Sequence, residues 1–139
     1  MIKGNCLCGS VRYEIKEMKG PLVHCHCSFC RKAHSAAFSS NLSALKKDFV
    51  LIAGEEFLSS YEATNELSKD KKRYFCANCG STLWHTKGSA PESMTFKMGC
   101  IEEFPDFDEQ NFASYHIYRH SDKPWLKYEG LEEYGDTKQ

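Results

Sequence analysis

The residues best suited to chemistry in this sequence are its cysteines. Seven of the eight fall into three clusters, Cys6-x-Cys8, Cys25-x-Cys27-x-x-Cys30 and Cys76-x-x-Cys79. Spacings of one and two residues are typical of metal ligands. Four thiolates complete a tetrahedral zinc ion, whereas three leave one position open to substrate or water. The seven clustered thiols therefore predict one closed metal site and one open site.

The first and third clusters have the form of two half-sites. If Cys6 and Cys8 lie in a strand, residues two apart point to the same face and present both sulfurs together. The segment 76–80 ends in glycine after two thiols, which is typical of a zinc knuckle. We expect Cys6, Cys8, Cys76 and Cys79 to share a structural zinc that ties the N-terminal strand to a later hairpin.

The middle cluster differs in kind, because it offers three thiols and no fourth. If a strand enters it, Cys25 and Cys27 share one face, and His24 and His26 share the other. Cys30 then returns from a short helix that starts near the N-cap-type residue Ser28. Three thiolates with an open fourth position are the arrangement expected of a catalytic zinc.

Two alternatives for this middle cluster stay open at the sequence level. A fourth protein ligand closes the site in the first alternative. The candidates are His34, His85, Cys100 and His116. In the second alternative the three cysteines form a reactive thiol group without metal.

The elements that must position these residues are mostly short strands. Alternating or apolar segments predict about six or seven strands and little helix beyond 28–33. The predicted strands are residues 11–15, 48–53, 57–61, 73–75, 82–85, 94–98 and 113–118. We expect 48–53 and 57–61 to form a hairpin, 102–111 to be a loop, and Trp84, Trp125 and Cys100 to be buried.

Bulk composition narrows the classes of protein. A length of 139 residues predicts one domain, and 18 basic against 19 acidic residues argue against a nucleic-acid surface. The first residues lack the apolar stretch of a secretory signal, and no apolar run is long enough to span a bilayer. We expect a cytoplasmic protein, in which reduced cysteines are metal ligands rather than disulfides.

Three stretches together carry a resemblance to a known family. They are Gly4-Asn5-Cys6-Leu7-Cys8-Gly9-Ser10-Val11-Arg12-Tyr13, Cys25-His26-Cys27-Ser28-Phe29-Cys30-Arg31-Lys32 and Phe75-Cys76-Ala77-Asn78-Cys79-Gly80-Ser81-Thr82-Leu83-Trp84. In this order they resemble the glutathione-dependent formaldehyde-activating (Gfa) enzymes, a family that includes centromere-protein-V-like proteins. The likeness spans roughly residues 3–130 of a single domain over 1–139, with a short C-terminal tail.

The resemblance implies a mainly β fold of the Mss4-like "β-tent" type, with short antiparallel strands and zinc knuckles. It implies two zinc ions per chain, a structural one on Cys6, Cys8, Cys76 and Cys79 and a catalytic one on Cys25, Cys27 and Cys30. It also implies a carbon–sulfur lyase that forms S-(hydroxymethyl)glutathione from the co-substrate glutathione and formaldehyde, or handles a related thiol–aldehyde adduct.

The chemistry of glutathione suggests further site residues. Its two carboxylates need cations, and Arg31 and Lys32 are the first candidates, followed by Arg73 and Lys97. The imidazole of His26 or His34 is a candidate proton relay to the nascent alkoxide, because imidazole titrates near neutrality.

Two other functions compete with this interpretation. The first is a non-catalytic zinc-binding interaction or chaperone module of the Mss4-like fold. The second is thiol redox chemistry that uses Cys100. We expect small-molecule thiol and aldehyde partners, and neither nucleic acid nor membrane.

Overall fold

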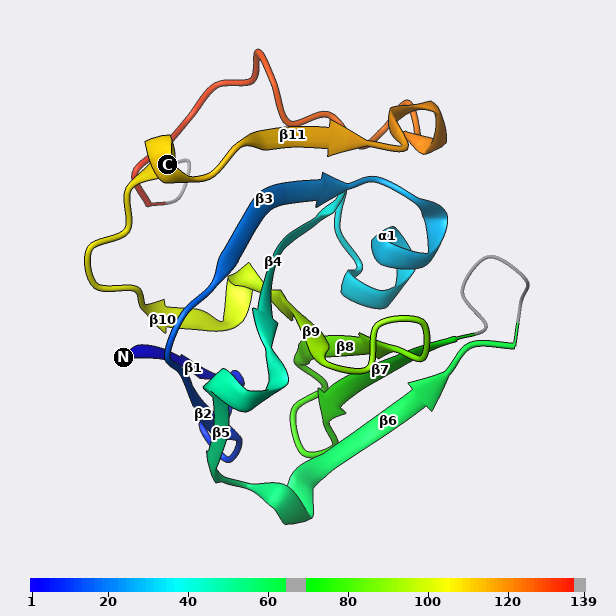
Figure 1. Ribbon diagram of the computed structural model, residues 1–139. Coiled ribbons are helices and arrows are strands. Elements are labelled where there is room, and N and C mark those ends of the chain that lie inside the picture. The colour runs from blue at the N-terminus through cyan, green and yellow to red at the C-terminus, as the bar shows by residue number, and fades with distance from the viewer. Residues whose placement is uncertain (65–69, 137–139) are drawn as a thin grey trace.

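The computed structural model describes residues 1–64 and 70–136, which form two β-sheets around a shared core (Figure 1). The smaller sheet has four strands in the order β10-β1-β2-β5, and all of its neighbours are antiparallel. These strands are β1 (Ile2–Asn5), β2 (Arg12–Ile15), β5 (Phe49–Ala53) and β10 (Ile101–Glu103).

The larger sheet has seven strands in the order β11-β3-β4-β9-β8-β7-β6. Its pairs are antiparallel apart from β11 with β3, which run parallel. The strands are β3 (Lys19–Cys25), β4 (Ser39–Leu45), β6 (Leu58–Glu62), β7 (Lys71–Cys76), β8 (Thr82–Lys87), β9 (Ser93–Lys97) and β11 (Ser114–Ile117).

Helix is scarce in the described residues, as the sequence predicts. The α-helix α1 (Ser28–His34) lies between β3 and β4 in the chain. Five short 3₁₀ segments complete the described elements: η1 (Lys46–Asp48), η2 (Glu55–Phe57), η3 (Met98–Cys100), η4 (Glu109–Asn111) and η5 (Arg119–Ser121). The expectation of a mainly β, tent-like fold of short strands is confirmed. Within these residues, no helix is both long and apolar enough to cross a bilayer.

Aromatic side chains from both sheets form the centre of the core. Tyr13 of the small sheet meets Trp84 edge-on at 5.3 Å between ring centroids and stacks on Phe96 at 5.6 Å. Phe49 packs on Trp84 at 5.0 Å. Gly4 makes room for this cluster, because a Cβ there would clash with the Tyr13 ring. Such aromatic contacts bury large apolar areas and hold the two sheets together.

Several local predictions are wrong. Residues 48–53 and 57–61 do not form a hairpin, because β5 pairs with β2 and β6 pairs with β7 in the other sheet. Gly54, at a φ of +92°, turns the chain into η2, and its Cα lies so close to the backbone of Ser10 that a Cβ would clash. The predicted loop 102–111 begins with part of β10, and the described residues contain eleven strands.

The burial predictions were correct for one of three residues. Trp84 is buried, but Trp125 is 75% exposed, because it lies beyond the last strand, in a segment without regular structure. Cys100 is half-buried in η3, and its Sγ donates to the Thr82 carbonyl at 3.5 Å.

Candidate metal centres

Four sulfur atoms meet where the two sheets approach each other. Cys6 and Cys8 lie in the turn after β1, Cys76 ends β7, and Cys79 lies in the turn into β8. Their Sγ atoms all lie within 4.8 Å of one another, with Cys6–Cys8 at 3.5 Å and Cys8–Cys76 at 3.9 Å. Zinc–sulfur bonds of about 2.3 Å in a tetrahedron place sulfurs about 3.8 Å apart. The four thiols therefore fit a zinc ion.

A turn, rather than the predicted strand, brings Cys6 and Cys8 together. The Gly9 amide donates to the Cys6 carbonyl at 3.0 Å, and the Val11 amide donates to the Cys6 Sγ at 3.2 Å. The expectation that the pair shares a strand face is therefore wrong, although the two sulfurs do lie side by side. The chain can reverse here because Gly9 adopts a φ of +76°, in the left-handed region that favours glycine.

The knuckle at 76–80 is a tight turn. The Gly80 amide donates to the Cys76 carbonyl at 2.7 Å, and Gly80 has a φ of +81°. Ser81 joins the two half-sites, since its Oγ accepts from the Leu7 amide at 2.9 Å and lies 3.4 Å from the Cys79 Sγ. The hydrogen bond with Ser81 lowers the pKa of Cys79 to about 5, which favours the thiolate that a metal requires.

Cys8 is the exposed member of this cluster. The Ser10 hydroxyl and then the Ser10 backbone hydrogen-bond its sulfur and lower its pKa to about 7, with a further contribution from Asn78. The Asn78 Nδ2 donates to the Cys8 Sγ at 3.3 Å. Neutral donors around each sulfur are the usual surroundings of a ligating thiolate.

The second cluster forms where β3 leads into α1. Cys25 ends β3, Cys27 is the N-cap of α1, and Cys30 lies in its first turn. Their Sγ atoms lie within 4.8 Å of one another, and the Cys30 amide donates to the Cys27 Sγ at 3.4 Å. The N-cap of α1 is therefore Cys27, whereas the sequence predicts Ser28. Three thiols at these separations fit three corners of a tetrahedron.

Among residues 1–64 and 70–136, no histidine, aspartate or glutamate joins these three thiols within the same ligand distance. Three of the four candidates for a fourth ligand have other partners. The His85 Nδ1 faces Lys97, the His116 Nδ1 faces His26, and Cys100 donates to Thr82. His34 lies at the end of α1, and its buried Nε2 has no hydrogen-bond partner among the described residues.

His26, between two of the thiols, points away from them into the C-terminal segment. Its ring is fully buried, with Nδ1 at 2.6 Å from the Asp122 Oδ1 and Nε2 at 2.7 Å from the His116 Nδ1. Its amide donates to the Ile117 carbonyl at 3.0 Å. Both ring nitrogens are occupied, so His26 is poorly placed as a proton relay. Sequence reasoning missed Asp122, because no spacing links it to a residue 96 positions earlier.

A cavity of about 420 Å³ lies between the end of α1, the start of β4 and the turn that follows Cys79, and it approaches the three-thiol cluster through Ser39. Its lining includes His34 from the end of α1, Ser39 from the start of β4, and Lys97 from β9. Ser39 also hydrogen-bonds Cys30, which connects the cavity wall to the thiols. Burial lowers the pKa of His34 to about 4, so this imidazole is neutral at pH 7.

The predicted cations for glutathione do not gather at one point. Lys32 is exposed and lines a second cavity of about 380 Å³ together with Phe29, Tyr61 and the buried Arg73. Arg31 is half-buried, and its Nε is unpartnered among the described residues. Lys97 lines the first cavity.

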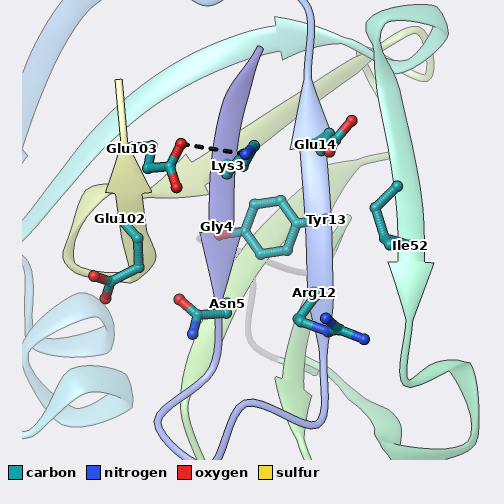
Figure 2. Close-up of a pocket in the computed structure, with 9 residues that line it drawn as sticks. All are labelled: Lys3, Gly4, Asn5, Arg12, Tyr13, Glu14, Ile52, Glu102 and Glu103. Atoms are coloured by element: carbon teal, nitrogen blue, oxygen red, sulfur yellow. Dashed lines mark ion pairs between the residues drawn. The ribbon is translucent and has the colours of Figure 1, made fainter. Parts of the chain in front are cut away.

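A third, shallow depression of about 310 Å³ lies on the four-stranded sheet (Figure 2). It is rimmed by charged residues such as Lys3 and Glu103, whose side chains pair at 3.3 Å. Its lining includes neither cysteine nor histidine, so we do not assign thiol or metal chemistry to it.

Comparisons with known proteins find relatives of this chain in both sequence and structure. A model of the family described as "Glutathione-dependent formaldehyde-activating enzyme" matches residues 1–121. An uncharacterized lyase of Schizosaccharomyces pombe is 32% identical over 127 residues, which cover 81% of this chain and 88% of that protein. A crystal structure of a Rhodobacter sphaeroides protein aligns with a TM-score of 0.59 and 29% identity, covering 75% of this chain and 91% of the other.

Proposed function

The chain belongs to the glutathione-dependent formaldehyde-activating enzyme family, and on that premise we propose that it is a zinc-dependent carbon–sulfur lyase. The proposed reaction joins glutathione and formaldehyde as S-(hydroxymethyl)glutathione, or handles a related thiol–aldehyde adduct. A relative that carries the name of a lyase supports this class of reaction. The observation that carries the proposal is a three-thiol cluster with no fourth ligand among the described residues, separate from a complete four-thiol cluster.

We assign different roles to the two clusters. Cys6, Cys8, Cys76 and Cys79 hold a structural zinc, because four thiols fill a tetrahedron. Cys25, Cys27 and Cys30 hold the catalytic zinc and leave one side accessible. A zinc ion bound there supplies positive charge that favours the ionised form of a nearby thiol.

The chain's own residues then bind and orient the substrates. Lys32 and Arg73 line one cavity next to α1, and with Arg31 they are suited to the carboxylates of glutathione. His34 stays neutral at pH 7, so it offers a hydrogen bond to a substrate hydroxyl rather than an imidazolium proton. The α1 helix carries Arg31, Lys32 and His34. It therefore positions two of the carboxylate-binding cations and the imidazole relative to the thiols.

Because formaldehyde and glutathione also combine without help, the test must measure a rate. Exchange NMR with ¹³C-formaldehyde follows adduct formation at equilibrium, while native mass spectrometry counts zinc per chain. We expect the wild type to hold two zinc ions and to accelerate exchange. Cys30→Ser should hold one zinc and lose the acceleration, whereas the control Lys47→Met, at an exposed position outside the site, should keep two zinc ions and the acceleration. A wild type with two zinc ions and no acceleration contradicts the lyase and favours a binding module.

A further inference from the structure

Lys97 is a buried cation with one hydrogen that no described residue accepts. Its side chain is 3% exposed, and its Nζ donates to the Asn41 Oδ1 and to the His85 Nδ1, both at 2.9 Å. Asn41 and Lys97 lie directly opposite each other on β4 and β9. An ammonium group has three hydrogens. Two of them have partners among the described residues, and Lys97 lines the same cavity as Ser39, whose side chain hydrogen-bonds Cys30.

The charge of Lys97 has no carboxylate partner in the part of the chain that the structure describes. A buried ammonium is costly unless it is paired, and burial lowers the pKa of Lys97 to about 8. The thiols of Cys30 and Cys25 oppose this shift, which places the ammonium within electrostatic reach of the cluster. A positive group held rigidly beside the thiols, with an unused donor, is suited to a small anionic oxygen.

We propose that the cavity lined by Ser39 and Lys97 binds the aldehyde and that the Lys97 Nζ donates a hydrogen bond to the aldehyde oxygen. This inference rests on the proposed lyase function. When the substrate thiolate attacks, a sulfur–carbon bond forms and the π pair of the carbonyl moves to oxygen. The resulting alkoxide takes up a proton from solvent, equal to the one the thiol released, so nothing is oxidised or reduced. Lys97 remains protonated and stabilises the charge that develops on oxygen.

The position of Lys97 favours the aldehyde oxygen over a carboxylate of the thiol. After addition, that oxygen lies two bonds from the substrate sulfur, so its donor must lie beside the thiol cluster. The carboxylates of glutathione are many bonds from its sulfur and can reach Lys32 or Arg73 in the neighbouring cavity. Lys97 therefore acts on the reacting atoms, and we expect it to affect turnover rather than thiol binding.

The test compares Lys97→Met with Lys47→Met, which removes an exposed lysine outside the site. Three properties are measured: the rate of adduct exchange at saturating substrate, glutathione affinity by calorimetry, and zinc per chain. We expect Lys97→Met to lower the rate by about 100-fold or more, as loss of one oxyanion donor does. Its glutathione affinity and two zinc ions should match those of Lys47→Met. If Lys97→Met does not fold, Asn41→Asp is the second variant, because a carboxylate at 41 neutralises the ammonium and should also lower the rate.

The outcomes separate this inference from the proposed function. An active wild type with an equally active Lys97 or Asn41 variant overturns the role of Lys97 and leaves the lyase standing. Weaker glutathione binding at an unchanged rate means that Lys97 holds a carboxylate instead. Loss of one zinc ion from Lys97→Met means that the ammonium offsets the negative charge of the thiolates that hold the zinc, and this result overturns the assignment of Lys97 to the aldehyde oxygen. A wild type without acceleration overturns both proposals.

Discussion

At the scale of single residues, the two thiol clusters differ in the groups that face their sulfurs. Neutral donors surround the four-thiol cluster, including the Val11 amide, the Asn78 amide and the Ser81 hydroxyl. The three-thiol cluster also has neutral donors, the Cys30 amide and the Ser39 side chain, but in addition it has the buried ammonium of Lys97 nearby. Neutral donors suit a metal that holds the fold, whereas a cation beside a cavity suits a site that binds reactants.

Tyr13 provides a residue-scale test of the core. Its hydroxyl is buried and unpartnered among the described residues, and burial raises its pKa, so the group stays neutral. An unsatisfied buried hydroxyl costs about 1–3 kcal/mol, because it has left water without gaining a hydrogen bond. We expect Tyr13→Phe to raise the free energy of unfolding by about 1 kcal/mol, measured by urea denaturation. A loss of stability would mean that the hydroxyl has a partner in solution.

A substitution at Gly4 on β1 tests the packing of the Tyr13 ring from the opposite strand. Figure 2 shows the Tyr13 ring reaching from β2 to Gly4 on β1, and a Cβ at Gly4 would clash with the ring. We expect Gly4→Ala to lower the free energy of unfolding by about 1–3 kcal/mol, since overpacking forces the aromatic cluster to move. Gly135→Ala is the control, because its added Cβ would meet nothing. Equal stability of the two variants would contradict the packing of Tyr13 on Gly4.

At the scale of elements, β11 and η5 form a brace behind the three-thiol cluster. The brace is held by the pairing of β11 with β3 and by the Asp122 carboxylate, which contacts His26 and accepts from the Arg119 Nε at 2.7 Å. Although burial alone would raise the pKa of Asp122, its hydrogen bonds with Arg119 and then His26 lower it. The carboxylate therefore stays ionised near neutral pH and keeps the imidazole of His26 in place.

Removing this carboxylate should loosen the brace locally. We expect Asp122→Ala to speed amide hydrogen exchange of His26 and Ile117 by about tenfold or more, while amides in the β7–β8 hairpin keep their protection. Asp136→Ala, at an exposed position, serves as the matched control. Unchanged exchange at His26 would show that strand pairing alone holds β11, and faster exchange throughout would indicate global destabilisation instead.

Sequence patterns predicted elements well where the signal is local. The alternation of 11–15 and the knuckle at 76–80 identify a strand and a turn without knowledge of their partners. The failed hairpin between 48–53 and 57–61 depends on which sheet each strand joins, and the pattern within either segment does not encode its partner β2 or β7. The surroundings of Lys97 could not be predicted from the sequence either, because they require β4, β9 and β8 to lie side by side in one sheet.

At the scale of the whole molecule, the four-thiol cluster joins the two sheets. Cys6 follows β1 of the small sheet, whereas Cys76 and Cys79 belong to the β7–β8 hairpin of the large sheet. The three-thiol cluster instead links β3 to the helix that directly follows it. A metal that bridges distant segments contributes its binding free energy to folding, while one that closes a local loop contributes less.

The two clusters should therefore differ in their effect on stability. We expect Cys79→Ser to lower Tm by roughly 10 °C or more, because it releases the contact between the sheets, and Cys27→Ser to lower it by less than roughly 5 °C. Calorimetry of both variants, with zinc counted per chain, checks this. A chelator should show the same difference between the two sites in the wild type. Loss of the first zinc ion should leave the fold intact, and loss of the second should coincide with unfolding. If Cys27→Ser unfolded the protein while Cys79→Ser did not, the structural and catalytic roles would have to be exchanged.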